Sequence, residues 1–105
     1  MNLKNKKLGM MISTPPENDN RVTATRLAEE ALAQGAAVYI YLIDEGVKLF
    51  TDPSIQGLKE KGAKLFACAY GAQQRGVEMG PQATWGGLVI LSNIVQGTDR
   101  FLSFN

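Results

Sequence analysis

Histidine is absent from this chain of 105 residues, and cysteine occurs once, as Cys68. Without histidine the chain cannot form a Ser-His-Asp triad, a Cys-His dyad or an imidazole metal site. A single cysteine also excludes an intrachain disulfide and a Cys-x-x-Cys redox pair. We therefore expect neither a metal nor a cofactor, and any nucleophilic catalysis would depend on one thiol.

The chain has no large excess of either charge, because its 11 basic and 10 acidic residues give a net charge of only +1. That balance gives no electrostatic reason to expect a nucleic-acid partner. Long hydrophobic runs are missing as well: the longest, residues 88–91 followed by Ile94 and Val95, is too short to span a bilayer. No signal-peptide pattern is visible, so the free thiol predicts a cytoplasmic protein without a membrane partner.

The phosphate-binding patterns G-x-x-x-x-G-K-[ST] and G-x-G-x-x-G are also missing. The hydrophobic fraction of 45% and the charged fraction of 20% are ordinary for a globular protein. With no linker or internal repeat, the composition predicts one domain over residues 1–105.

Apolar runs and helical patterns alternate along the chain. Residues 20–34 give the clearest helix, because Ala24, Leu27, Ala28 and Ala31 recur on one face before Gly35. Shorter helices are expected after Pro53, at residues 71–75 and within residues 81–96. Strands are expected at residues 8–12, 37–43, 63–67, 77–79 and 100–104.

This alternation predicts an α/β three-layer sandwich with a five-stranded, mostly parallel sheet in the flavodoxin-like order 2-1-3-4-5. In that order, the direction of strand addition reverses between the first and third strands. Ligands gather there, beyond the carboxyl ends of the strands. Cys68 would then lie beside Ser13 and Thr14, and we expect these two residues, with Tyr70 and Gly71, to line a pocket.

Cys68 stands where the apolar residues 65–67 end and a short polar helix begins. Backbone N–H groups and the helix dipole at such a junction stabilise a thiolate, which predicts a partly accessible thiol with a lowered pKa. The alternative is a small hydrophobe in the core. Arg75 is a candidate anion contact, or it stabilises the end of its own helix before Gly76. Tyr70 could hydrogen-bond the sulfur or simply pack in a loop.

The segment from Trp85 through two glycines into residues 88–91 is too apolar for the surface helix of a small monomer. We predict a subunit interface formed by Trp85, Leu88, Leu91 and Ile94, with ordinary core burial as the alternative.

The segment from Cys68 to Val77, Cys-Ala-Tyr-Gly-Ala-Gln-Gln-Arg-Gly-Val, resembles the cysteine-bearing turn and helix of the DsrE/DsrF-like family, which includes TusD-type sulfur-relay proteins. Residues 33–35, 45–47 and 99–104 are similar to that family as well. The resemblance implies a small α/β subunit that forms homotrimers or homohexamers. In sulfur-transferring members, it implies a persulfide on the cysteine matched here by Cys68.

Three functions stay open at this point. As a sulfur relay, a candidate sulfurtransferase, the protein would accept sulfane sulfur from a donor protein on Cys68 and pass it to an acceptor protein. As a non-catalytic oligomeric module, it would bind a small ligand or a protein, with Cys68 only lining the pocket. A thiol redox sensor would need a resolving cysteine from another subunit.

Overall fold

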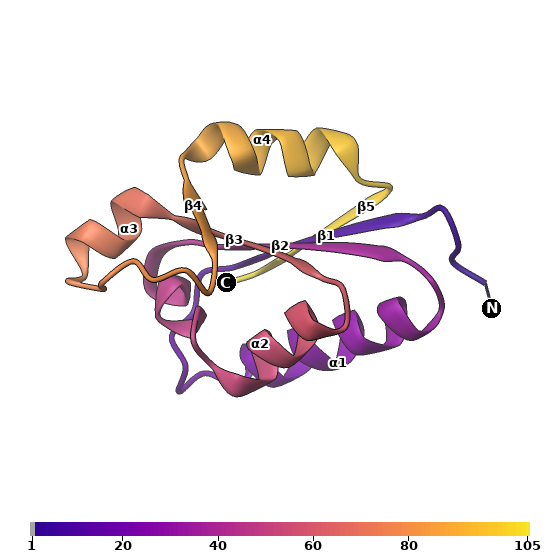
Figure 1. The fold of residues 1–105 in the computed structure, drawn as a ribbon, viewed down its shortest axis with the longest axis horizontal. Helices are drawn as coiled ribbons and strands as arrows, with labels where there is room; N and C mark the ends of the chain where they lie inside the picture. The colour runs from indigo at the N-terminus through magenta and orange to yellow at the C-terminus, as the bar shows by residue number, and fades with distance from the viewer. Residues whose placement is uncertain (1) are drawn as a thin grey trace.

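The computed structural model describes residues 2–105 as one parallel sheet with helices on both faces (Figure 1). The elements in chain order are β1 (Lys7–Ile12), α1 (Asn20–Ala33), β2 (Ala37–Leu42), η1 (Asp44–Leu49), α2 (Pro53–Glu60), β3 (Lys64–Cys68), α3 (Ala69–Gln74), β4 (Thr84–Gly86), α4 (Leu88–Gly97) and β5 (Arg100–Phe104). Helices α1 and α2 cover one face of the sheet and α4 covers the other. No helix in this part of the chain combines the length and apolar character needed to cross a bilayer.

The five strands are all parallel and lie in the order β4-β3-β2-β1-β5, so the predicted α/β class with layers on both faces is confirmed. The order 2-1-3-4-5 is not the one observed, because β1 pairs with β2 and β5 rather than with β2 and β3. Short crossovers through α1 and α2 add each strand beside the last, and α4 then carries the chain back across the sheet. Right-handed crossovers permit either order, so the alternation of elements could not decide between them.

Two elements in the middle of the chain differ from their predicted positions. Residues 77–79 are not a strand, and the fourth strand is instead the three-residue β4. The helix expected within residues 81–96 begins only at Leu88, after a turn at Pro81 and the extended Gly87. Two adjacent glycines delay the helix, because glycine loses more backbone entropy in a helix than any other residue.

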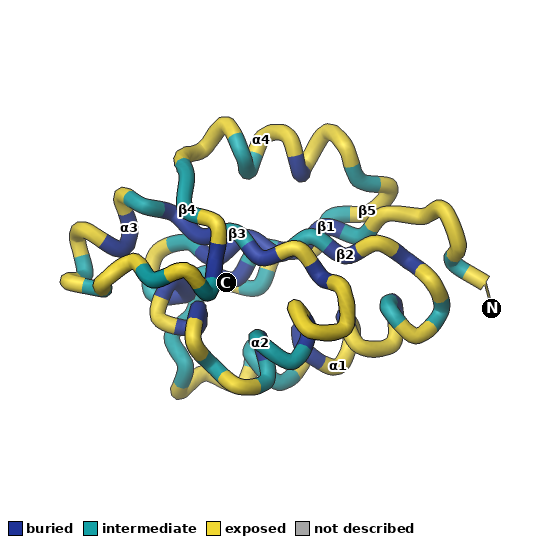
Figure 2. The backbone as a smooth tube through the Cα atoms, in the orientation of Figure 1, coloured by how far each residue is buried: buried dark blue, intermediate teal, exposed yellow. Residues whose placement is uncertain are grey.

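The larger hydrophobic core lies between the sheet and the α1–α2 layer. Alternate residues of β1 and β2 face it, among them Met10, Ile12, Ile40 and Leu42. Small alanines on α1 let this helix pack closely on the sheet, and Ile55 and Leu58 on α2 complete the layer. The inward sides of both helices are buried in Figure 2. On α1, Ala24, Ala28 and Ala31 are buried as the periodicity of residues 20–34 predicts, whereas Leu27 is 44% exposed and that part of the prediction is wrong.

Helix α4 crosses the opposite face of the sheet, which is much less closed. Ile94 is the buried residue of this helix, and Figure 2 shows most of the remaining helix exposed. Close approach of α4 to the sheet depends on Gly9, because a Cβ atom there would lie 2.8 Å from Ile94 Cγ2. The second, smaller core on this face contains Tyr41, Val47, Cys68 and Ile94.

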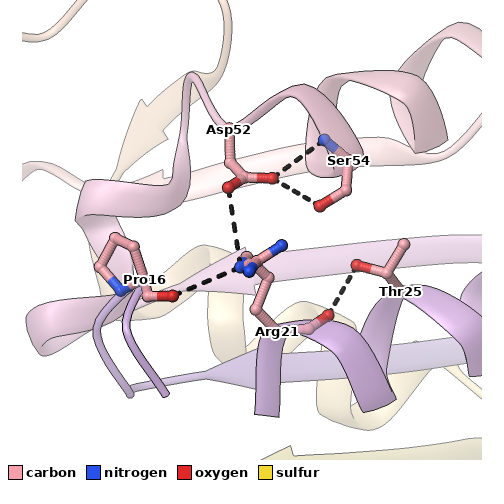
Figure 3. A network of polar contacts seen from close by, with 5 residues as sticks. All are labelled: Pro16, Arg21, Thr25, Asp52 and Ser54. Atoms are coloured by element: carbon pink, nitrogen blue, oxygen red, sulfur yellow. Dashed lines mark hydrogen bonds and ion pairs between the residues drawn. The ribbon is translucent and has the colours of Figure 1, made fainter. Parts of the chain in front are cut away.

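The loop after β1 is tied to the start of α2 by a polar network (Figure 3). Arg21 Nε donates to the Pro16 carbonyl at 3.4 Å and lies 3.7 Å from Asp52 Oδ2. Asp52 caps α2 by accepting the backbone N–H of Ser54 at 2.9 Å. The network therefore fixes the loop over the carboxyl end of β1 before the chain enters α1.

Candidate functional site

Cys68 is the last residue of β3 and the N-cap of α3, as the sequence predicts. Its Sγ accepts a hydrogen bond from the backbone N–H of Gly71 at 3.4 Å. The side chain is only 5% exposed, so the expectation of a partly accessible thiol is wrong for the single chain. Cys68 shares the smaller core with Tyr41, Val47 and Ile94, which the sequence pattern around Cys68 alone could not reveal.

Tyr41 is the residue of this site that the sequence analysis missed. It lies opposite Phe66 in the β2–β3 register, and Cys68 follows Phe66 by two residues on the same face of the sheet. The Tyr41 side chain is 0% exposed, and its hydroxyl donates to the Gly87 carbonyl at 3.3 Å. Burial raises the pKa of Tyr41, and the neighbouring Cys68 raises it further.

Of the four predicted pocket residues, Gly71 is the one that the structure brings to the sulfur. Little space is left there, since a Cβ atom at Gly71 would lie 3.3 Å from Val47 Cγ1 and 3.7 Å from Cys68 Cβ. Tyr70 is 66% exposed, and its hydroxyl accepts a hydrogen bond from Gln74 Nε2 at 2.8 Å. Tyr70 is therefore a surface residue of α3 in the single chain rather than a cover over the thiol.

Ser13 and Thr14 lie at the end of β1, which β2 separates from β3. The Ser13 hydroxyl donates to the Phe104 carbonyl at 3.3 Å and to Asn105 Oδ1 at 3.0 Å, so it ties β1 to β5. Thr14 Oγ1 is buried without a hydrogen-bond partner among the described residues. The predicted juxtaposition of this loop with Cys68 is wrong because the sheet reverses between β1 and β5 instead.

Arg75, the candidate anion contact, is engaged in an ion pair. Its Nε lies 2.6 Å from Glu45 Oε2, and its Nη1 approaches the Gly71 carbonyl at 3.5 Å. The hydrogen bond from Lys48, followed by the one from Arg75, holds the pKa of Glu45 below its ordinary value. This arrangement favours the alternative role of Arg75, which is to stabilise the carboxyl end of α3 and link it to η1.

The family assignment follows from a comparison with known protein families. The model of the DsrE/DsrF-like family matches residues 6–104, nearly the whole chain. The chain belongs to the DsrE/DsrF-like family. The resemblance seen in the segment from Cys68 to Val77 is thereby confirmed.

Two solved structures have the same fold as this DsrE/DsrF-like chain. The ychN protein from E. coli superposes with a TM-score of 0.77 at 19% identity, covering 99% of this chain and 100% of its own. A conserved protein of unknown function, BT1422 from Bacteroides thetaiotaomicron, gives a TM-score of 0.74 at 17% identity, with coverage of 95% and 96%. At these identities the likeness shows the fold alone. No curated protein matches the chain significantly in sequence.

The residues predicted for a subunit interface divide into two groups in this DsrE/DsrF-like fold. Ile94 is 5% exposed and belongs to the core of its own chain. Trp85 is half-buried, with its ring 5.0 Å edge-to-face from Phe50 and its Nε1 donating to the Gly80 carbonyl at 2.7 Å. Leu88 and Leu91 are available for an interface, since Leu88 is exposed and Leu91 half-buried on α4.

The same face of the sheet also carries a cavity of about 320 Å³ beneath α4. Its walls are formed by Tyr39, Phe66, Ile90 and Ile94, with the polar residues Lys7, Asn93 and Thr98 and with Gly97; Cys68 is not among them. Within residues 2–105, no three His, Cys, Asp or Glu side chains gather as metal ligands would. The thiol and the cavity are therefore separate features of one face of the DsrE/DsrF-like sheet.

Proposed function

We propose that this protein is a sulfur relay, a sulfurtransferase that carries sulfane sulfur as a persulfide on Cys68. The observation that supports the proposal most directly is the position of Cys68 in a chain of the DsrE/DsrF-like family: its Sγ accepts the Gly71 N–H, and it shares a buried cluster with Tyr41. Persulfide transfer requires thiols and neither histidine nor metal, which fits the composition of the chain.

In the loading step, the Cys68 thiolate attacks the outer sulfur of a donor persulfide, R–S–SH. The new bond joins Sγ to that sulfur, the S–S bond of the donor breaks, and the donor leaves as R–S⁻. An acceptor thiolate then attacks the outer sulfur of Cys68–S–SH, so that Cys68 leaves as a thiolate and the acceptor becomes the persulfide. No net oxidant is consumed, and the need for free thiols supports a cytoplasmic location.

Burial of Cys68 sets a condition on this chemistry, because a thiol that is 5% exposed cannot meet a donor cysteine directly. Transfer therefore requires a local opening around the sulfur. The start of α4 is a candidate for this opening, because it follows β4, which pairs with Cys68, and its Leu88 and Val89 are 62% and 74% exposed. Between transfers, the closed form would protect the persulfide from unrelated thiols.

The proposal is tested by incubating the protein with a persulfidated cysteine desulfurase, or with thiosulfate and a sulfurtransferase, and measuring its mass. The wild type should gain about 32 Da, one sulfur atom, and lose it on reduction. Cys68→Ser should gain nothing, because a hydroxyl is a far weaker nucleophile. A wild-type mass that stays unchanged with several donors would contradict the relay.

A small-ligand binding module is the second candidate function, and the cavity beneath α4 supports it. Its volume of about 320 Å³ and mostly apolar walls are typical of a small ligand site. A ligand there should raise the melting temperature of the wild type and of Cys68→Ser equally, because Cys68 does not line the cavity. That result together with an unloaded Cys68 would favour the module over the relay.

We further propose that α4 packs against a second copy of this chain in a homotrimer or homohexamer. The helix carries no charged residue and leaves Leu88, Val89 and Val95 exposed, which suits a contact between identical subunits. Light scattering should give a multiple of the monomer mass, and Val89→Lys should shift it to the monomer. Ala33→Lys adds the same charge on the exposed end of α1 and should leave the assembly intact. A monomer mass for the wild type at micromolar concentration would contradict the proposal.

A further inference from the structure

The hydroxyl of Tyr41 is in an unusual position for a tyrosine in the middle of a parallel sheet. β2 is flanked by β1 and β3, with Tyr41 in register with Met11 and Phe66, and its side chain is wholly buried. A buried phenol needs a hydrogen-bond partner. The Gly87 carbonyl supplies one at 3.3 Å, which is long for an O–H···O hydrogen bond, so this contact is weak.

Cys68 lies near the same hydroxyl, because it pairs with Gly86 in the β3–β4 register and Gly87, the acceptor of the hydroxyl, is the next residue. Both side chains lie on the α4 face of the sheet and belong to one buried cluster. The neighbouring Cys68 and, above all, burial raise the pKa of Tyr41, so the phenol keeps its proton at neutral pH. It therefore has one proton to donate and two acceptors, a neutral carbonyl and a sulfur whose charge changes during transfer.

We propose that Tyr41 is a hydrogen-bond donor to the reacting sulfur, turning from the Gly87 carbonyl to Cys68 Sγ whenever the cysteine is a thiolate. A hydrogen bond to an ionised acceptor is stronger than one to a neutral acceptor, which decides the competition. The Gly87 carbonyl is not left unpaired by this change, because it also accepts from the Ile90 N–H at 3.1 Å. As a role in sulfur transfer, this inference rests on the proposed function.

The second donor is needed because a thiolate buried at this depth is costly to form. The Gly71 N–H reaches Sγ at 3.4 Å, and Cys68 belongs to a buried, largely apolar cluster. Cys68 must be a thiolate when it is loaded and must leave as a thiolate when it gives the sulfur away. A donor that stabilises Sγ⁻ increases the thiolate fraction and makes Cys68 a better leaving group.

Other charges near the site are largely neutralised by one another. Besides Tyr41, the ionisable residues on the elements around Cys68 are Tyr39 of β2, Lys64 at the start of β3, Asp44, Glu45 and Lys48 of η1, Tyr70 of α3 and its C-cap residue Arg75. Glu45 pairs with both Lys48 and Arg75, and α4 carries no ionisable residue. Tyr41 is thus the fully buried ionisable side chain in the cluster that contains the sulfur, and Tyr39 packs against that cluster half-buried.

The test is a titration of the Cys68 thiolate by its ultraviolet absorbance in the wild type, Tyr41→Phe and Tyr39→Phe. Tyr41→Phe should raise the midpoint by about one pH unit, the effect of losing a hydrogen bond to a charged group. Tyr39→Phe is the matched control, because Tyr39 lies on the same strand and face, half-buried, and should leave the midpoint unchanged. An unchanged midpoint in Tyr41→Phe would overturn the inference.

Sulfur loading of the same three proteins separates this inference from the proposed function. If all three gain sulfur while the midpoints agree, Cys68 is a carrier and Tyr41 is not its donor. If the midpoint of Tyr41→Phe rises but the wild type gains no sulfur, the hydrogen bond is real and has no role in transfer, which overturns the inference as a statement about sulfur relay.

A measurement on the unmodified chain covers the case in which Tyr41→Phe does not fold. In the wild type labelled with ¹³C at the tyrosine Cζ atoms, the Tyr41 resonance should shift at the midpoint of Cys68 ionisation, because its hydrogen bond changes partner. The resonances of Tyr39 and Tyr70 should stay in place. A Tyr41 resonance that ignores the ionisation of Cys68 would refute the exchange of partners.

Discussion

Ile94 holds α4 onto the sheet, and its truncation gives the sharpest prediction about the fold. Ile94→Ala removes three buried carbon atoms from a side chain that is 5% exposed. At about 0.8 kcal/mol for each buried carbon, the lost transfer free energy is about 2.4 kcal/mol. A cavity term normally adds to this value, but Ile94 already borders the 320 Å³ cavity. We therefore expect a loss of about 2–3 kcal/mol, at the low end of the range for such changes.

The partner of Ile94 on β1 allows this packing to be measured as a coupling. Gly9→Ala places a Cβ atom 2.8 Å from Ile94 Cγ2 and 2.9 Å from Phe101 Cδ1, so overpacking should destabilise the protein by about 1–3 kcal/mol. Ile94→Ala removes the nearer of these obstacles. The double variant should therefore lose about 0.5–1 kcal/mol less stability than the sum of the losses in the two single variants. The relief is only partial because the new Cβ atom still lies against Phe101.

The assay is urea unfolding of the wild type, the two single variants and the double variant, with Gln96→Ala as the control on an exposed position of α4. The control should stay within about 0.5 kcal/mol of the wild type. If Ile94→Ala unfolds as the control does, α4 is not anchored through this side chain. Strictly additive losses at Gly9 and Ile94 would refute the close contact between β1 and α4.

Two further predictions concern other parts of the chain. Asp52→Ala should reduce stability in thermal unfolding by about 1 kcal/mol, because the Ser54 N–H loses its cap, whereas Asp52→Asn should retain most of it; equal losses in both variants would point to the ion pair with Arg21 instead. The pKa of Tyr41 is raised in the fold above its ordinary value of 10.0, so the unfolded chain releases this proton first. Stability from Tyr41 is thus fully present below about pH 10 and lost as the pH rises above it. Urea midpoints at increasing pH should fall more steeply for the wild type than for Tyr41→Phe; parallel curves would contradict the buried phenol.

Local patterns in the sequence were sufficient to predict the positions of most helices and strands. The alanine stripe before Gly35 predicts a helix over residues 20–34, and α1 spans Asn20–Ala33. The apolar run that ends at Cys68 predicts the junction of β3 with α3, which the structure contains. Both cases depend on neighbours in sequence, where periodicity and helix-ending residues are informative.

Long-range packing decided what the sequence analysis missed. The order of the strands depends on α4 crossing the sheet, and no residue near α4 encodes the identity of the strand that follows it. Tyr41 lies in a run of β-branched and aromatic residues that is typical of any strand. A weak signal was present: Tyr39 and Tyr41 alternate with Val38, Ile40 and Leu42, which predicts two hydroxyls on one face of a central strand.

The pairing of β5 with β1 has a consequence for how the chain folds as it is synthesised. Lys7 and Asp99, 92 positions apart in the sequence, form two hydrogen bonds. The Lys7 N–H donates to Asp99 Oδ2 at 2.7 Å, and the Asp99 N–H donates to the Lys7 carbonyl at 2.8 Å. A contact of such separation forms late, because closing a long loop precedes any gain from pairing. Until Arg100–Phe104 leaves the ribosome, β1 has a free, apolar edge beside an otherwise assembled sheet. We expect the nascent chain to be most prone to aggregation in that interval, and β5 to end it by covering the edge.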